Sequence, residues 1–322
     1  MPHTDSSHFC LWQCDGVHMK KPKIKNNTGQ DIAFSIVNYT FFALFTIACA
    51  YPFYYLIINT ISANDLSANG FIRFLPKKIH FENYIQVLKL EGLSRAALIS
   101  VGRTIIGTTC TVMSSAFLGF LFSQEDMWKR KLWYRMLVVT MYFNAGLIPM
   151  YLTMKNLHLT NSFWVYIIPA IVQPFNIILV KTYIESTPAS LQEAAEIDGA
   201  GILTVFFRII FPISKPILAT ITIFSAVGQW NSFGDTLIYI TNQKLYSLQY
   251  LLYVYINQAN SLAQLVKTNT SGSVNVQSLI TQQTPTSIRM TVSIIVVLPI
   301  LFIYPIFQRY FIKGIMMGSI KG

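Results

Sequence analysis

The stretch STPASLQEAAEIDGAGILTVFFRIIFPISKP, residues Ser186 to Pro216, is polar, acidic and rich in turn residues, in a chain that consists mostly of apolar segments. Pro188 is favoured in the first turn of a helix, and Thr187 before it is a suitable cap, so a helix is expected to begin here. Gly199 and Gly201 follow the helical pattern, and glycine tolerates the positive φ of a chain reversal. The stretch is therefore predicted to form a helix, a turn and a second helix.

Acidic residues are concentrated in this segment. They are Glu185, Glu193, Glu196 and Asp198. Negative charge disfavours a helix that lies on an anionic lipid surface and favours contact with a basic groove on another protein. A small, shallow helix face is predicted from the i, i+3, i+4 spacing of Leu191, Ala194 and Ala195. We therefore interpret residues 185–210 as a docking loop for a partner protein.

The composition places the chain in a membrane. Of its 322 residues, 53% are hydrophobic and only 11% are charged, and the mean hydropathy is +0.46. A soluble domain of average composition is less apolar. The formal charge of +11 would suit a nucleic-acid partner, but the Lys and Arg residues are scattered between apolar runs and form no basic stripe. Nucleic-acid binding is therefore not expected.

Six apolar segments are long enough to cross about 30 Å of hydrocarbon as helices. They run from Phe34 to Ser62, Ala96 to Phe122, Leu132 to Met154, Phe163 to Tyr183, Phe211 to Ile240 and Met290 to Tyr310. A β-barrel would alternate apolar and polar residues, whereas these runs are apolar at both parities. The predicted fold is an all-α, polytopic membrane protein with six transmembrane helices within residues 31–310.

Basic residues at the ends of these segments predict their orientation. They precede the first segment at Lys20 to Lys25, separate the second from the third at Lys129 to Arg135, and follow the sixth at Lys313 and Lys321. Since basic residues are enriched in cytoplasmic loops, both termini are expected in the cytoplasm.

Four further segments follow from this orientation. Residues 1–30 and 311–322 are expected to be cytoplasmic tails. Residues 241–287 are expected to be an outer loop, long enough to hold short helices or a binding surface. Met19 before the lysine cluster is typical of a natural start, which makes residues 1–18 a candidate tag or extended start.

The docking loop resembles the EAA loop of binding-protein-dependent ABC importer permeases. The similarity rests on Glu193-Ala194-Ala195, Asp198-Gly199-Ala200 and the hydrophobic run that ends at Pro212. The resemblance implies coupling helices that sit in a cleft of a cytoplasmic ATPase, with the glutamate paired to a basic residue there. The implied coupling residues are Glu193, Ala194, Ala195, Asp198, Gly199 and Ala200. The alternative is an ordinary amphipathic connector between two membrane helices.

The resemblance extends over Asp31 to Gly322 and is similar to the carbohydrate branch of that family, in particular to the smaller maltose-type permease subunit and to oligosaccharide permeases of polysaccharide-utilisation systems. It rests on Phe74-Leu75-Pro76, Asn83-Tyr84, Leu147-Ile148-Pro149, Trp230-Asn231 and the ending Tyr310 to Gly314 with Lys321-Gly322. Two departures are Phe120-Leu121-Phe122, where relatives commonly have Ala-Tyr-Ala, and the missing basic residue after Asp198-Gly199-Ala200.

The resemblance implies a type I ABC importer permease fold in a bacterial cell membrane and a function in carbohydrate uptake, with an importer permease for a non-sugar solute as the alternative. The implied partners are a second homologous permease, two ATPase subunits, an extracytoplasmic solute-binding protein, an oligosaccharide substrate and the lipid bilayer. The C-terminal residues Lys313, Gly314, Lys321 and Gly322 would contact the ATPase.

Enzymatic and ion-coupled chemistry is not indicated. The chain has no Gly-Lys-Ser or Gly-Lys-Thr, so it lacks the phosphate-binding loop of ATP hydrolysis, and ATP and Mg²⁺ are expected on the partner ATPase. No catalytic residue, cofactor or metal site is predicted on this chain. The His residues lie in tails or loops and form no proton relay, and the cysteines show neither disulfide nor zinc spacing. A membrane-embedded enzyme would need a convergent nucleophile or carboxylate pair, and a sensor would need a cytoplasmic domain.

Neutral amides within the segments are the candidates for a substrate path. Amides both donate and accept hydrogen bonds, and aromatic rings cover the apolar face of a sugar. The candidates are Tyr142, Asn144, Gln173, Phe175, Asn176, Trp230 and Asn231. Interhelical hydrogen bonding is the alternative for each amide. Arg103 and Asp235 are expected to extend toward the outer membrane surface, and no function is assigned to them.

Overall fold

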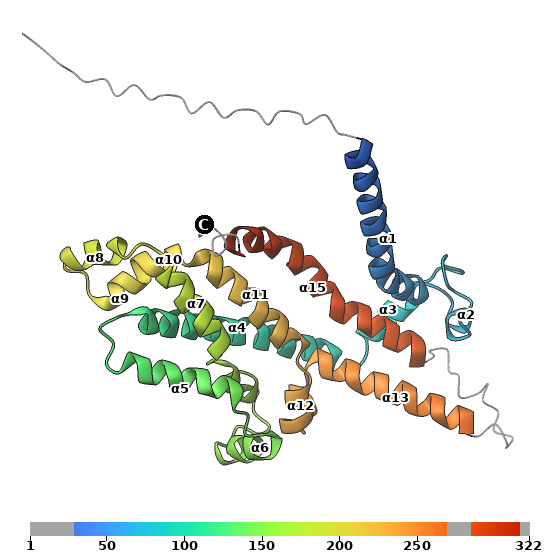
Figure 1. The fold of residues 1–322 in the computed structure, drawn as a ribbon. Helices are drawn as coiled ribbons and strands as arrows, with labels where there is room; N and C mark the ends of the chain where they lie inside the picture. The colour runs from blue at the N-terminus through green and yellow to red at the C-terminus, as the bar shows by residue number, and fades with distance from the viewer. Residues whose placement is uncertain (1–28, 269–284, 316–322) are drawn as a thin grey trace, which may run out of the picture. The chain divides into compact units, whose positions relative to one another are not determined.

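The computed structural model describes residues 29–268 and 285–315, and every regular element in these two ranges is a helix (Figure 1). The all-α class is therefore confirmed for the described part of the chain.

The long helices are α1 (Gly29–Thr60), α4 (Leu93–Ser123), α11 (Lys215–Asn231), α13 (Leu248–Thr268) and α15 (Pro285–Ile315). The intermediate ones are α5 (Arg130–Tyr142), α6 (Leu147–Asn156), α7 (Pro174–Glu185) and α8 (Ser190–Ile197). The short ones are α2 (Asn64–Ala68), α3 (Glu82–Leu88), η1 (Phe163–Tyr166), η2 (Ile168–Ala170), α9 (Ile202–Val205), η3 (Phe206–Ile210), α10 (Phe211–Ile213), α12 (Gly234–Tyr239) and η4 (Gln243–Leu245).

The chain divides into two compact units, Met1–Pro52 and Phe53–Gly322. In the first unit, the described residues belong to α1 and expose large apolar side chains such as Phe34 and Phe45. The second unit begins within α1 and contains all the other helices.

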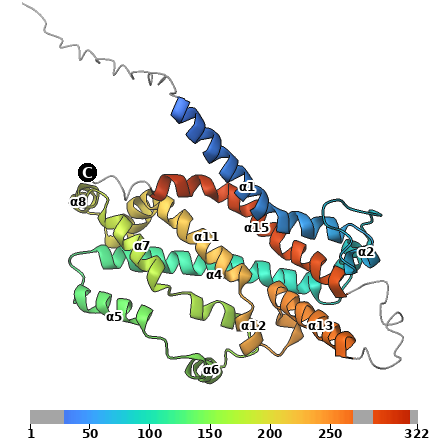
Figure 2. The ribbon, with the colours of Figure 1, turned by 45° about the vertical axis from the view of Figure 1, so that its right-hand side comes forward.

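The centre of the second unit is α4, which packs against both α7 and α11 (Figures 1 and 2). Gly119 permits a close approach of α7, because a Cβ at this position would lie 2.8 Å from Cβ of Val180. Helix α15 packs against both α11 and α13. Small residues at such contacts are typical of membrane helix bundles, where van der Waals packing stabilises the association.

Breaks interrupt three of the predicted segments. Helices α5 and α6 meet at 117°, the η1–η2 segment and α7 at 43°, and the helical segment Ile202–Ile213 and α11 at 79°. Gly146, with φ of +89°, lies at the first break. The sequence predicted continuous helices here because hydropathy records length and not direction.

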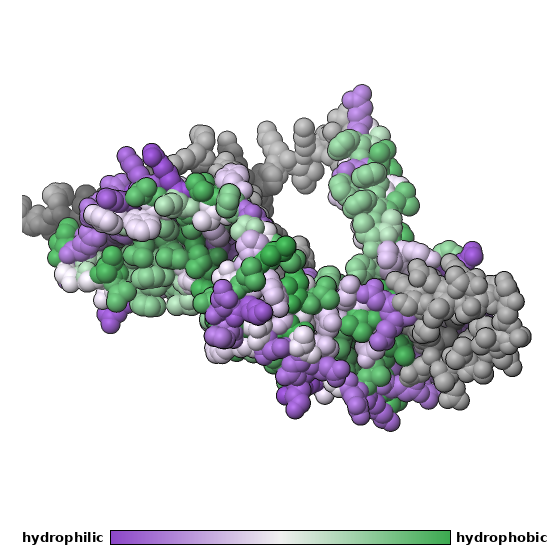
Figure 3. Space-filling model, turned by 90° about the horizontal axis from the view of Figure 1, so that it is seen from below, coloured by the Kyte–Doolittle hydropathy of each residue, from purple (hydrophilic) through white to green (hydrophobic). Residues whose placement is uncertain are grey.

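The described residues contain two unbroken helices that are long and apolar enough to cross a membrane, Ile32–Thr60 and Leu93–Ser123, or up to five candidates if each bent pair is one span. Apolar side chains also gather in broad areas of the face seen in Figure 3. Helix α5 has no buried residue and exposes Met136 and Val139. This surface is what a membrane protein presents to lipid or to another membrane subunit.

Helices also occur in the segment between α1 and α4 and in the predicted outer loop of residues 241–287. The first holds α2 and α3, and it is fixed to the end of α1 by amide hydrogen bonds: Asn83 Nδ2 donates to Thr60 O at 2.8 Å. Ser67 Oγ donates to Asn59 Oδ1 at 2.8 Å. The second holds η4 and the 21-residue helix α13.

Candidate functional site

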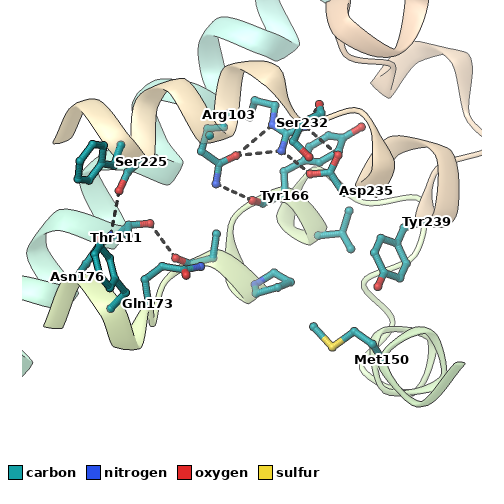
Figure 4. A pocket seen from close by; sticks show the side chains of 17 residues that line it. Arg103, Thr111, Met150, Tyr166, Gln173, Asn176, Ser225, Ser232, Asp235 and Tyr239 are labelled. Atoms are coloured by element: carbon teal, nitrogen blue, oxygen red, sulfur yellow. Dashed lines mark hydrogen bonds and ion pairs between the residues drawn. The ribbon is translucent and has the colours of Figure 1, made fainter. Parts of the chain in front are cut away.

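A cavity of about 550 Å³ lies among α4, α7, α11 and α12 (Figure 4). Its polar and charged lining side chains are Arg103, Thr111, Tyr166, Gln173, Asn176, Ser225, Gln229, Ser232, Asp235 and Tyr239. The remaining lining residues are Met150, Val165, Pro169, Ala170, Phe175, Phe224 and Gly228. The wall therefore combines hydrogen-bonding groups with aromatic rings, which suits a ligand that has hydroxyl groups and apolar ring faces.

Arg103 does not extend toward the membrane surface as predicted. It is 1% exposed, and it forms an ion pair with Asp235. Its Nε and Nη2 donate to Gln229 Oε1 at 3.1 and 3.0 Å. A buried guanidinium needs such partners because an unpaired charge in a low-dielectric interior is costly. The sequence contained one indication of this pair: Arg103 and Asp235 carry opposite charges and lie toward the predicted outer ends of the second and fifth apolar segments.

Tyr166 completes the network. The Arg103 guanidinium carbon lies 4.3 Å from the centroid of the Tyr166 ring, a cation–π contact. The Tyr166 hydroxyl donates to Leu245 O at 2.7 Å, and Gln229 Nε2 donates to Tyr166 O at 3.2 Å. The network therefore joins α4, η1, α11 and α12 at one end of the cavity.

Three of the seven predicted path residues line this cavity: Gln173, Phe175 and Asn176. Gln173 and Phe175 are exposed, whereas Asn176 is buried and its Nδ2 donates to Ser225 Oγ at 3.4 Å. The break between η2 and α7 brings these residues to the wall, because Gln173 precedes the first turn of α7.

The other four predicted path residues do not line the cavity. Tyr142 is 87% exposed at the end of α5, and Asn144 Oδ1 accepts from Gly146 N at 2.9 Å in the α5–α6 break. Trp230 packs against the α13–α15 contact, where its Nε1 donates to Val296 O at 2.9 Å. Asn231 is exposed at the end of α11. Helical periodicity explains the result for Trp230, since Gln229 and Trp230 point about 100° apart.

The docking loop has the predicted helix and reversal, but its start differs. Helix α8 begins at Ser190, and its cap residue Ala189 makes no side-chain hydrogen bond. Thr187 Oγ1 instead donates to Ile184 O at 2.6 Å, a bond back to the preceding turn that threonine commonly forms. Thr187 therefore closes α7 and does not cap α8.

Gly199 forms the reversal after α8 with φ of +78°. Its N–H donates to Glu196 O at 3.0 Å, and the N–H of Ala200 donates to Ala195 O at 2.9 Å. This pair of bonds is the Schellman motif, which satisfies the last carbonyls of a helix and requires the left-handed conformation at the glycine. Gly201, with φ of −68°, is not left-handed.

The two sides of α8 differ in what they contact. Ala195 is buried in an apolar cluster with Val205 and Phe206. Glu193 and Ala194 are exposed, and Ile197 is 86% exposed. Ala195 therefore contributes to the attachment of α8 to the rest of the chain, together with Gln192, whose Oε1 accepts from Gln124 Nε2 at 2.9 Å. The predicted coupling role of these residues stays a prediction.

The cluster beneath α8 contains Phe120, one of the residues at which the chain departs from the resembled family. Phe120 and Phe206 pack with ring centroids 5.3 Å apart, and Phe117 meets Phe206 edge-on at 5.4 Å. A smaller cavity of about 250 Å³ lies beside this contact, between the end of α4 and the docking loop. It is lined by Phe120, Leu121, Gln124, Asp126, Met127, Glu196, Ala200, Ile202 and Val205.

The C-terminal prediction falls partly outside the described residues. Lys313 and Gly314 belong to the last turn of α15, whereas Lys321 and Gly322 lie outside the described ranges. Residues 1–18, the candidate tag or extended start, lie outside them as well.

Comparisons with known proteins place this architecture in context. The chain is 32% identical over 298 residues to the protein LplC of Bacillus subtilis (strain 168), which covers 92% of this chain and 98% of LplC. It is 29% identical over 289 residues to the polygalacturonan/rhamnogalacturonan transport system permease protein YtcP of the same organism, which covers 90% of this chain and 98% of YtcP. No family model matches the chain.

Among solved structures, a chain of a bacterial ABC transporter involved in the import of the acidic polysaccharide alginate superposes with a TM-score of 0.77 and 27% identity, over 88% of this chain and 98% of that one. Similarity in sequence and in structure thus runs over nearly the full length of permease subunits, and the relatives are transport components rather than enzymes. This chain belongs to the family of carbohydrate ABC importer permeases.

Proposed function

We propose that this chain is one of two homologous permeases in a bacterial importer that takes up an oligosaccharide released from a polysaccharide. The observation that carries this proposal is the cavity, whose wall of amides, hydroxyls and aromatic rings matches the chemistry of a saccharide. The names of the relatives support the substrate class, since YtcP is named for polygalacturonan and rhamnogalacturonan and the structural neighbour imports alginate.

The proposed topology has six spans with both termini in the cytoplasm of a bacterial cell. The two unbroken spans, the three bent pairs and α15 together make up the six. In this arrangement the docking loop lies on the cytoplasmic side, and the segment from η4 through α13 lies outside. The basic flanks of the spans support this orientation.

The proposed partners are a second permease, two ATPase subunits and an extracytoplasmic solute-binding protein. The ATPase would receive the outward side of α8, where Glu193 presents a carboxylate and Ile197 an apolar side chain. The C-terminal residues Lys313, Gly314, Lys321 and Gly322 would add a second contact. ATP and Mg²⁺ would bind to the ATPase, with no cofactor on this chain.

Reconstitution tests the proposal. The chain is co-expressed with its second permease, ATPase and binding protein, and the complex is placed in proteoliposomes with ATP inside. We expect uptake of a labelled plant cell-wall oligosaccharide that requires both ATP and the binding protein. Purification of the chain without any ATPase, or uptake that persists without ATP, would contradict the proposal.

A further inference from the structure

The guanidinium of Arg103 has all its donors engaged within the protein. An arginine has five N–H groups. Nε and one N–H of Nη2 donate to Gln229 Oε1. Nη1 donates to Ser232 O at 3.2 Å and to Asp235 Oδ1 at 3.1 Å, and the second N–H of Nη2 donates to Asp235 Oδ2. With its side chain 2% exposed, Arg103 offers no free donor to a ligand.

Asp235 differs from its partner in both exposure and hydrogen bonding. Its side chain is 21% exposed and lines the cavity. The carboxylate accepts the two bonds from Arg103 and one from its neighbour, because Thr236 N donates to Oδ1 at 2.8 Å. A carboxylate accepts about four hydrogen bonds. Oδ1 accepts two of these bonds and Oδ2 accepts one, so acceptor capacity remains on Oδ2 of this cavity-lining carboxylate.

The two members of this ion pair also differ in how accessible they are from the cavity. Arg103 and Asp235 are the only charged side chains among the residues that line the cavity. The cation is covered by Tyr166 and Gln229, whereas the anion is the accessible member. A ligand in this part of the cavity thus meets an acceptor of negative charge.

We propose that Asp235, held in place by Arg103, is a specificity-determining residue that accepts hydrogen bonds from saccharide hydroxyls and disfavours saccharide carboxylates. This inference rests on the proposed function. A hydroxyl donates to the open acceptor of Asp235, while a uronate carboxylate in the same place would repel it. Arg103 is a positioning residue that fixes the carboxylate by its bonds across α4, α11 and α12.

The test uses the complete reconstituted transporter and two probes of equal length, trigalacturonate and its trimethyl ester, which is neutral. Uptake of each is measured for the parent and for Asp235→Asn, and the result is the ratio of acidic to neutral uptake. Every variant is assayed with the same binding protein. Any preference of that protein for one probe therefore affects the parent and the variants equally, and it cancels when their uptake ratios are compared. We expect the ratio to rise about tenfold in Asp235→Asn, the scale of one removed like-charge contact.

A second variant separates charge from folding. Arg103→Gln/Asp235→Asn replaces the ion pair with a neutral, hydrogen-bonding pair, so it removes the carboxylate without leaving an unpaired guanidinium. It is expected to show the same raised ratio. If Arg103 were the saccharide ligand, the ratio would fall in this double variant, and that result would overturn the proposal.

An unchanged ratio in both variants, or loss of assembly in both, would mark the pair as purely structural and also overturn the inference. The parental transporter separates this failure from a failure of the proposed function. If the parent takes up no oligosaccharide at all, the proposed function is wrong, whereas parental uptake with an unaltered ratio in the variants refutes only the role of Asp235.

Discussion

At the scale of single residues, two glycines show opposite constraints. Gly199 has a positive φ of +78° and open space where a Cβ would lie. Gly107 lies within α4, where a Cβ would come within 2.7 Å of Gln229 Nε2. The first is constrained by its backbone and the second by its neighbour, so their substitutions should differ in effect.

Gly199→Val is expected to uncouple ATP hydrolysis from transport while the chain still inserts and assembles. A side chain in the left-handed conformation costs about 1–2 kcal/mol, so the reversal after α8 should be distorted. Gly201→Ala is the matched control, because Gly201 has φ of −68° and open space for a Cβ. The measurement is ATPase activity stimulated by the loaded binding protein. Equal stimulation in both variants would contradict a coupling role for Gly199.

Gly107→Ala is expected to destabilise the assembled transporter by about 1–3 kcal/mol, the usual cost of overpacking a well-packed site. Gln229 cannot move away freely, because it accepts from Arg103 and donates to Tyr166 O. Gly102→Ala on the same helix is the control, since its Cβ would meet Phe163 at an ordinary 3.7 Å. The thermal midpoint of the two purified variants in detergent distinguishes them, and equal midpoints would refute the packing argument.

Trp230→Phe is expected to lower stability by about 1 kcal/mol, because it leaves Val296 O without the indole donor. Saccharide selectivity should be unchanged, since Trp230 packs against α13 and α15 and not against the cavity. Uptake of several oligosaccharides, compared with the thermal midpoint, checks both parts. A change in selectivity at parental stability would return Trp230 to the substrate path.

At the scale of elements, the contact between α4 and α7 depends on one small residue. A Cβ at Gly119 would lie 2.8 Å from Cβ of Val180 and 3.1 Å from the backbone N of Lys181. Neither atom lies at the end of a flexible side chain. The two helices would therefore have to separate to admit even a methyl group.

Gly119→Ala is accordingly expected to lower the thermal midpoint more than Gly107→Ala does, because a backbone contact cannot relax by a change of rotamer. The loss should appear as lower yield of the assembled complex. Gly102→Ala again serves as the control. A Gly119→Ala variant as stable as Gly102→Ala would show that the α4–α7 contact adjusts without cost.

The breaks between elements were the least predictable part of the fold. Hydropathy identified the apolar segments, but the 117° turn between α5 and α6 depends on the positive φ of Gly146. Polarity and position in the sequence selected Gln173, Phe175 and Asn176, which line the candidate cavity, and their role in a substrate path stays a prediction. Arg103 and Asp235 were missed, because their pairing depends on which faces of α4 and α12 meet, and periodicity alone does not give the rotation of one helix against another.

At the scale of the whole molecule, the described part of the chain exposes apolar side chains that suit contact with lipid or with another protein. Helix α5 buries no residue, and α8 exposes Ile197.

Deletion of residues 315–322 should weaken assembly with the ATPase while membrane insertion persists, because these residues are too few to fold alone and carry apolar side chains suited to a partner surface. Co-purification of the ATPase measures the effect, and parental uptake by the truncated chain would contradict it.

The apolar cluster beneath α8 has a mechanical consequence. Ala195 and Phe206 of the docking loop share this cluster with Phe120 of α4, Val180 of α7 and Ile221 of α11. Close-packed interiors have low compressibility and transmit strain. We therefore expect a displacement of α8 to move the parts of α4, α7 and α11 that share this cluster together as one rigid group. The deformation of the chain during transport would then be concentrated where packing is interrupted, at the breaks between the bent helix pairs.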